Sequence, residues 1–215
     1  LAPFTDLFNH EMMHDWLGNK IDEGRPERPG EPVLRWFKEG FTEYYGLRNR
    51  WKAGFLDDAA FLRELNDDFI GAHYRSPFGQ LTDREADRRM WESHELFEVP
   101  YRRGCVLALY LDCAIRQQSG NQQTLFDAMR DLLEQFHGTG RTLNDNYDRF
   151  TAILEEHYGA EIEGLLNQYV AKGQLIPASQ FRVPDFLEIK PDAQGAPRVA
   201  FKPGVKDAAA KFKKD

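Results

Sequence analysis

Apolar residues recur at helical spacing along most of this chain. From Phe4 to Ile21 they return every three or four positions, a pattern that predicts an amphipathic helix with one buried stripe. The stripe consists of Phe4, Leu7, Phe8, Met12, Trp16, Leu17 and Ile21. The next segment, residues 22–32, holds three prolines and two glycines and is therefore predicted to be a surface loop.

The same spacing predicts that most of the remaining chain is helical. The expected helices run from Leu34 to Lys52, Asp57 to His73, Tyr101 to Gln117, Asn121 to Phe136, Leu143 to His157 and Ile162 to Val170. The helix from Tyr101 is apolar almost all round, so we expect it at the centre of the core. Between Tyr74 and Pro100 the pattern is irregular and charged, which indicates a long lid-like loop that includes a short helix from Asp83 to Trp91.

The pattern changes after Pro177. Proline, glycine and alternating apolar residues predict a short hairpin or a linker there, and the Ala- and Lys-rich end from Asp207 to Asp215 is expected to fray. We therefore expect a mainly α-helical domain over residues 1–177 and a short irregular or β-containing extension or linker over residues 178–215.

Composition bounds the class of protein. A chain of 215 residues with 41% hydrophobic residues can bury one sizeable core. The net charge of −7 argues against nucleic acid or an anionic membrane surface as the main partner, and no apolar run approaches the roughly 20 residues that span a bilayer. Cys105 and Cys113 lie eight positions apart on one expected helix, about 12 Å along its axis, which is too far for a disulfide. We expect both to be buried thiols.

The sequence His10-Glu11-Met12-Met13-His14 carries the first candidate chemistry. On a helix the two imidazoles share one face and can bind one metal ion, while Glu11 is placed to accept a proton from a water on that metal. Hydrolytic zinc sites have three protein ligands and one open position. A third ligand must therefore come from elsewhere. The pattern also fits two partly exposed histidines that bind nothing.

A second motif, residues 36–45, supplies the missing carboxylate. It reads Trp-Phe-Lys-Glu-Gly-Phe-Thr-Glu-Tyr-Tyr, with Glu39 and Glu43 on one helix face. This spacing suits Glu39 as the third metal ligand and Glu43 as the group that accepts the outer N–H of a ligating histidine. The alternative for Glu43 is a solvated surface charge.

Together these motifs resemble two related families of zinc peptidases. Residues 10–19, His-Glu-Met-Met-His-Asp-Trp-Leu-Gly-Asn, are similar to the motif of the aminopeptidase N family, whereas residues 36–45 look more like that of the glycyl aminopeptidase family, bacterial and archaeal peptidases that usually carry a PDZ domain. The 24 residues between His14 and Glu39 favour the second. Both families are gluzincins, so the resemblance implies the helical part of a thermolysin-like domain followed by a helical bundle, with His10, His14 and Glu39 as zinc ligands and Glu11 as the general base.

A third motif, Tyr101-Arg102-Arg103-Gly104, is similar to the Tyr-x-Arg/Lys-Gly of both families. The resemblance implies that the Tyr101 hydroxyl stabilises the oxyanion of the reaction; without it, Tyr101 would count only as an aromatic at a helix start. It also implies an upstream β-rich domain, which would precede Leu1. Because the chain starts at Leu1 and not at Met, we expect a piece of a larger protein.

We therefore expect Zn²⁺-dependent hydrolysis of a peptide or protein substrate, as an aminopeptidase. Two alternatives stay open: an endopeptidase of the same clan, and a non-catalytic helical module with a structural or vestigial zinc site. Of the remaining histidines, His94 could border the cleft but fits a surface position better, and His73, His137 and His157 read as helix-end residues without a role. Trp16, Trp36, Tyr44 and Tyr45 are expected to pack in the core around the metal-binding helices.

Overall fold

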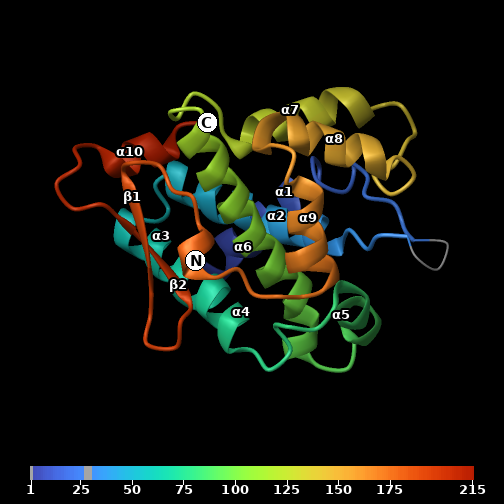
Figure 1. The fold of residues 1–215 in the computed structure, drawn as a ribbon, viewed down its shortest axis with the longest axis horizontal. Helices are drawn as coiled ribbons and strands as arrows, with labels where there is room; N and C mark the ends of the chain where they lie inside the picture. Colours follow the sequence, from blue (N-terminus) through green and yellow to red (C-terminus); the bar gives the residue numbers. More distant parts are fainter. Residues whose placement is uncertain (1, 27–30) are drawn as a thin grey trace.

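The computed structural model describes residues 2–26 and 31–215 (Figure 1), and side chains in its first helix from Thr5 onward. The fold is mainly helical, as predicted. The side chain of Phe4 and residues 27–30 of the expected loop fall outside what is described; the rest of the loop 22–32 is irregular, as expected.

The chain forms successive helices and one small sheet. The α-helices are α1 (Ala2–Met13), α2 (Arg35–Lys52), α3 (Asp58–Glu64), α4 (Ala72–Arg75), α5 (Asp83–Arg89), α6 (His94–Gln118), α7 (Leu125–Phe136), α8 (Tyr147–Tyr158), α9 (Ile162–Leu166) and α10 (Ala208–Lys213). Two π-helical segments, η1 (Leu65–Gly71) and η2 (Asn167–Ala171), continue α3 and α9, and η3 (Ala178–Gln180) is a 3₁₀ turn. Strands β1 (Leu187–Pro191) and β2 (Pro197–Phe201) pair antiparallel, with Ile189 opposite Val199.

Helices α2 and α6 form the centre of the molecule, and α6 runs through the middle of the view in Figure 1. They cross at Gly40 and Gly104. A Cβ added at Gly104 would lie 1.8 Å from the backbone oxygen of Trp36, and one at Gly40 would lie 2.2 Å from the Cα of Gly104. Only glycine at both positions allows this approach. The glycines of two sequence motifs are therefore the contact point of the two central helices.

The first helix is shorter and less buried than predicted. Helix α1 ends at Met13, and its expected apolar stripe is largely exposed: Leu7 by 61%, Phe8 by 53%, Met12 by 56% and Trp16 by 45%. Only Leu17 and Ile21, beyond the helix, are buried. The reason lies in the packing. The backbone of α1 at His10 lies against Gly46 of α2, so the face with His10 meets the core and the stripe points away.

The long lid-like loop predicted between Tyr74 and Pro100 is shorter in the structure than expected. Helix α5 matches the expected short helix, but α6 begins at His94, where the Ser93 hydroxyl accepts the Leu96 N–H. Only residues 76–82 and 90–93 are irregular. Pro100 lies inside α6, although proline usually marks a helix boundary, and this misled the sequence interpretation.

The C-terminal segment packs onto the helical core. The predicted hairpin is present as β1 and β2, but the frayed end is not, because residues 208–213 form α10. Its Phe212 is fully buried, and its carbonyl accepts a hydrogen bond from Arg48 at 2.9 Å. The carbonyl of Lys214 accepts one from Arg116 at 2.6 Å. These contacts order the C-terminal end, which its Ala- and Lys-rich sequence predicted to fray.

Two further predictions can be checked on the described residues. Cys105 and Cys113 are buried free thiols, as expected. None of the helices in the described ranges has both the length and the apolar character that crossing a bilayer requires.

Candidate metal centre

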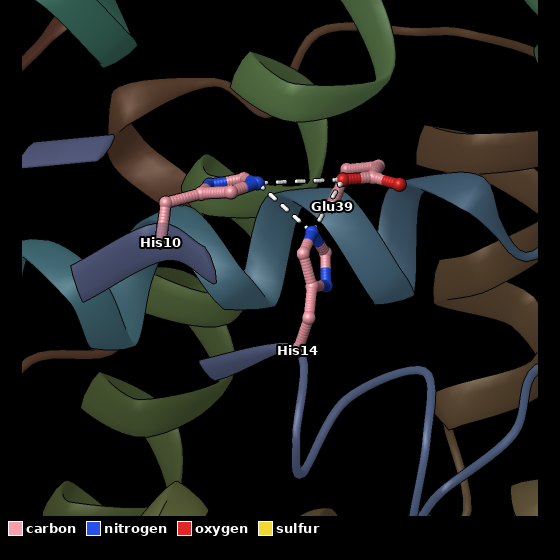
Figure 2. A group of neighbouring side chains, drawn as sticks. All are labelled: His10, His14 and Glu39. Carbon is pink, nitrogen blue, oxygen red and sulfur yellow. Dashed lines mark hydrogen bonds and ion pairs between the residues drawn. The ribbon is translucent and has the colours of Figure 1, made fainter. Parts of the chain in front are cut away.

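Three potential metal-binding atoms converge between α1 and α2 (Figure 2). His10 comes from the last turn of α1, His14 from the turn just after it, and Glu39 from α2. The Nε2 atoms of His10 and His14 lie 3.0 Å apart, and Glu39 Oε2 lies 3.6 Å from the first and 3.3 Å from the second. The residues of the two sequence motifs therefore meet in space, although His14 lies in the turn after α1 and not on the same helix as His10.

These distances suit a tetrahedral zinc ion. Zinc bonds of about 2.0–2.1 Å at tetrahedral angles set the ligand atoms about 3.3 Å apart, which lies inside the observed range of 3.0–3.6 Å. Two imidazoles and one carboxylate are also a common ligand set for hydrolytic zinc. The residues present thus fit this metal.

The outer nitrogens of both histidines face acceptors. His14 Nδ1 lies 3.0 Å from the carbonyl oxygen of Leu17, and His10 Nδ1 makes a 3.1 Å ion-pair contact with Glu43 Oε1. An Nδ1–H on each ring leaves the Nε2 lone pair free, and both Nε2 atoms point to Glu39. For a neutral ring, the Leu17 carbonyl beside His14 and the Glu43 carboxylate beside His10 therefore favour the tautomer that binds a metal through Nε2.

The charges of this cluster shift its pKa values strongly. Burial opposes a charge on His10, but the carboxylates of Glu39 and Glu43 outweigh it and raise its pKa to about 10. The Glu39 carboxylate is likewise opposed by burial, yet its two histidine neighbours lower its pKa to about 2. In the metal-free chain His10 therefore carries a proton, and with it a positive charge, at the place where a metal cation would bind.

Tyr101 and Glu11 flank this cluster differently. The Tyr101 ring stacks on the His10 ring at 6.0 Å between centroids. Burial first, and then the negative charge of Glu39, raise the pKa of Tyr101, so its phenol is a neutral donor at pH 7. Tyr101 lies in the third turn of α6 and not at a helix start as predicted. Glu11 lies next to His10 in α1 and is exposed.

Comparison with known proteins points to one family. Residues 3–94 match the family model of the M61 glycyl aminopeptidases, a range that includes His10, His14 and Glu39. The N-terminal part of the chain, which carries these residues, is thus similar to the M61 glycyl aminopeptidases. A crystal structure of an aminopeptidase N family protein from Idiomarina loihiensis shares its fold, with a TM-score of 0.68 at 20% identity over 88% of this chain. The match covers 34% of that protein, so the present chain spans about a third of its length. No curated protein matches.

Some features of this site could not be predicted from the sequence. The carbonyl that faces His14 belongs to Leu17, and a backbone oxygen has no signature in the sequence. Trp36, Tyr44 and Tyr45 are buried as predicted, but Trp16 is 45% exposed.

The remaining histidines lie outside the cluster. The His94 side chain is 85% exposed at the start of α6. His73, near the end of α4, is buried, and burial followed by the Arg103 charge lowers its pKa to about 3. His137 and His157 lie at the ends of α7 and α8, as expected.

Proposed function

We propose that this chain carries the zinc site of a peptidase and takes part in peptide-bond hydrolysis as an aminopeptidase. The observation that supports this most strongly is the convergence of His10, His14 and Glu39 with an acceptor at the outer nitrogen of each ring. Two surface histidines that bind no metal would not be expected to converge with a carboxylate and to have an acceptor at each outer nitrogen. The relationship to glycyl aminopeptidases supports the same reaction class.

In this proposal each residue has a separate task. Zinc held by His10, His14 and Glu39 would act as a Lewis acid on the peptide carbonyl and lower the pKa of a water molecule. Glu11 accepts the proton of the attacking water and delivers it to the leaving amine. Tyr101 donates its phenolic hydrogen to the oxygen that becomes negative in the transition state.

The direct test separates metal binding from turnover. We expect Glu11→Gln to keep one zinc per chain and to lower kcat by about 10²–10⁴-fold, because the general base is lost and the ligands are not. Zinc is measured by elemental analysis and turnover with fluorogenic aminoacyl and internal peptides. No stoichiometric zinc in metal-replete protein rejects the site, and full activity of Glu11→Gln rejects the base.

The same substrates distinguish an aminopeptidase from an endopeptidase of the same clan. Cleavage of peptides with a free amine but not of N-acetylated ones supports the first, and cleavage of both supports the second. The measurement is made on this chain and on the longest natural protein that contains it. Stoichiometric zinc without cleavage in either would support the structural-zinc alternative.

Tyr101→Phe tests the oxyanion role. Removing one pre-positioned donor typically lowers kcat by about 10²–10³-fold, and we expect this loss with little change in KM or zinc content. The variant keeps the ring that stacks on His10. An unchanged kcat would assign Tyr101 to packing alone.

A further inference from the structure

A line of aromatic rings leads from the candidate metal centre to the protein surface. The Tyr101 ring, stacked on His10, has the Phe97 ring 4.9 Å away, and Phe97 has the Trp91 ring at 5.5 Å. Each distance lies in the range of contacting aromatic pairs. We name Trp91, Phe97 and Tyr101 the aromatic strip.

The outer end of the strip is unusually exposed. Trp91 is 78% exposed, the highest value among the exposed large hydrophobic side chains of the described residues. A single exposed apolar side chain needs no explanation, but one that is continuous with further apolar surface can mark a binding site. Phe97 is half-buried between Trp91 and Tyr101, so the exposed apolar surface continues inward and does not end at Trp91.

The backbone that carries Trp91 is held by contacts on both sides. It follows α5, and the preceding Met90 is 1% exposed and anchors the turn in the core. The Glu92 N–H donates to the Arg89 carbonyl at 2.9 Å, and Ser93 caps α6 on the other side. A rigid turn that presents a large exposed aromatic side chain resembles a preformed binding surface more than a loose surface residue.

We propose that Trp91 and Phe97 bind an apolar or aromatic side chain of the peptide substrate, close to the scissile bond. The proposal rests on the proposed function, because Tyr101 at the inner end is the residue assigned to the reacting carbonyl. An extended peptide rises about 3.3 Å per residue. Centroid distances of 4.9 and 5.5 Å therefore place Phe97 and Trp91 within about three residues of the scissile bond.

A peptide is the occupant because the strip is continuous with the candidate centre. A surface for an unrelated partner would have no reason to end at the ring that stacks on His10. Aromatic rings also bind apolar side chains without requiring a charged partner. The strip thus selects for an apolar residue near the cleaved bond.

The test uses tetra-alanine and the four peptides in which one alanine is replaced by phenylalanine, with the full chain or its longest natural form. We expect at least one phenylalanine peptide to have a kcat/KM about tenfold above that of tetra-alanine, the scale of an apolar pocket contact. Trp91→Ala should remove this advantage, so that the phenylalanine peptide and tetra-alanine are cleaved with similar kcat/KM. Trp91→Phe should retain most of it. Phe55→Ala, which removes another exposed aromatic (65%) from the loop after α2, is the matched control.

A binding measurement keeps the two proposals separable. The affinity of Glu11→Gln for the same peptides is measured by calorimetry, with and without Trp91→Ala. One outcome is that the unmodified protein cleaves none of the peptides, while the tighter binding of phenylalanine peptides still depends on Trp91. The aromatic strip is then confirmed as a peptide-binding site and the proposed function fails. If Trp91→Ala leaves the preference intact, or no phenylalanine peptide exceeds tetra-alanine in cleavage or binding, the strip is not a substrate site.

Discussion

Glu43 is the residue whose side chain contacts the outer face of a candidate ligand. Its Oε1 lies 3.1 Å from His10 Nδ1, so its charge favours the Nδ1–H tautomer and makes Nε2 a better donor to a cation. This contact favours the orienting role over the alternative, a solvated surface charge, although the Glu43 side chain is 22% exposed.

Replacing Glu43 should therefore weaken zinc binding. For Glu43→Gln we expect the zinc dissociation constant to rise about 10–100-fold, the usual cost of losing such an orienting carboxylate. It is measured by competition with a chelating indicator. The control is Glu156→Gln, which removes a surface glutamate whose side chain is 59% exposed. Equal affinity in both variants would contradict the role of Glu43.

The raised pKa of His10 predicts proton release on zinc binding. At pH 8 an ordinary histidine, with a pKa near 6.5, is neutral, whereas His10 in the metal-free chain, with a pKa of about 10, holds a proton that a ligand must lose. Calorimetry in two buffers of different ionisation enthalpy should therefore show at least one proton released per zinc at pH 8. Affinity should rise with pH up to about 10.

The same shift has the opposite effect on the metal-free fold. Because the folded pKa of His10 lies above its unfolded value, its pairing with Glu39 and Glu43 stabilises fully below about pH 6.5 and is lost as pH rises to about 10. Metal-free protein should thus lose stability over this range. Zinc binding at pH 8 without proton release would contradict the shift.

At this scale the sequence predicted side chains better than backbone groups. His10, His14 and Glu39 were singled out by their motifs and do converge, although α1 ends before His14. The Leu17 carbonyl beside His14 could not be predicted, since it depends on how the chain turns after α1.

Among elements, the crossing of α2 and α6 determines how Tyr101 meets the metal-binding residues. Glu39 is next to Gly40, and Tyr101 lies three residues before Gly104. The sequence predicted both helices, but neither their close contact nor the true start of α6 at His94. A glycine in a sequence motif can serve a turn, a ligand contact or helix packing, and the sequence does not say which. The structure shows that Gly40 and Gly104 face each other.

Gly104→Ala should separate the two helices. Its Cβ would meet the Trp36 backbone oxygen at 1.8 Å, and a backbone atom cannot turn aside as a side chain can. We expect a loss of about 1–3 kcal/mol in the free energy of unfolding. We also expect a lower kcat with nearly unchanged zinc affinity, because Tyr101 moves while the ligands on α1 and α2 stay together.

Gly164→Ala in α9 is the matched control. Nothing lies within 4 Å of its added Cβ, and alanine favours a helix over glycine by about 1 kcal/mol. Chemical denaturation should show opposite signs for the two substitutions. A neutral Gly104→Ala would mean that the crossing tolerates a side chain.

In the whole molecule, the C-terminal segment is fastened by buried charges. Phe212 lies between the guanidinium groups of Arg48 and Arg116, at 4.8 and 5.2 Å from its ring. Asp112 on α6 pairs with both arginines, at 3.6 and 3.0 Å. The boundary after residue 177 stays a prediction, but the residues beyond it share the core of those before it.

Phe212→Ala measures how firmly this end is attached. A fully buried phenylalanine replaced by alanine usually costs about 3–5 kcal/mol, and here the paired guanidinium groups would also lose their packing. The expected fall in unfolding free energy is compared with that of Phe55→Ala, which should stay within about 0.5 kcal/mol. Equal small effects would mean that residues 178–215 behave as a linker.

The order of the site residues along the chain has a consequence for folding. His10, His14 and Glu39 are separated by short stretches, whereas Tyr101 comes 62 positions after Glu39 in the sequence. Contacts over shorter loops cost less entropy and form earlier. During folding, α1 and α2 would therefore gather a metal before α6 docks at Gly40. A half-folded chain would hold zinc without being able to stabilise an oxyanion, and would acquire reactivity only as its last central helix arrives.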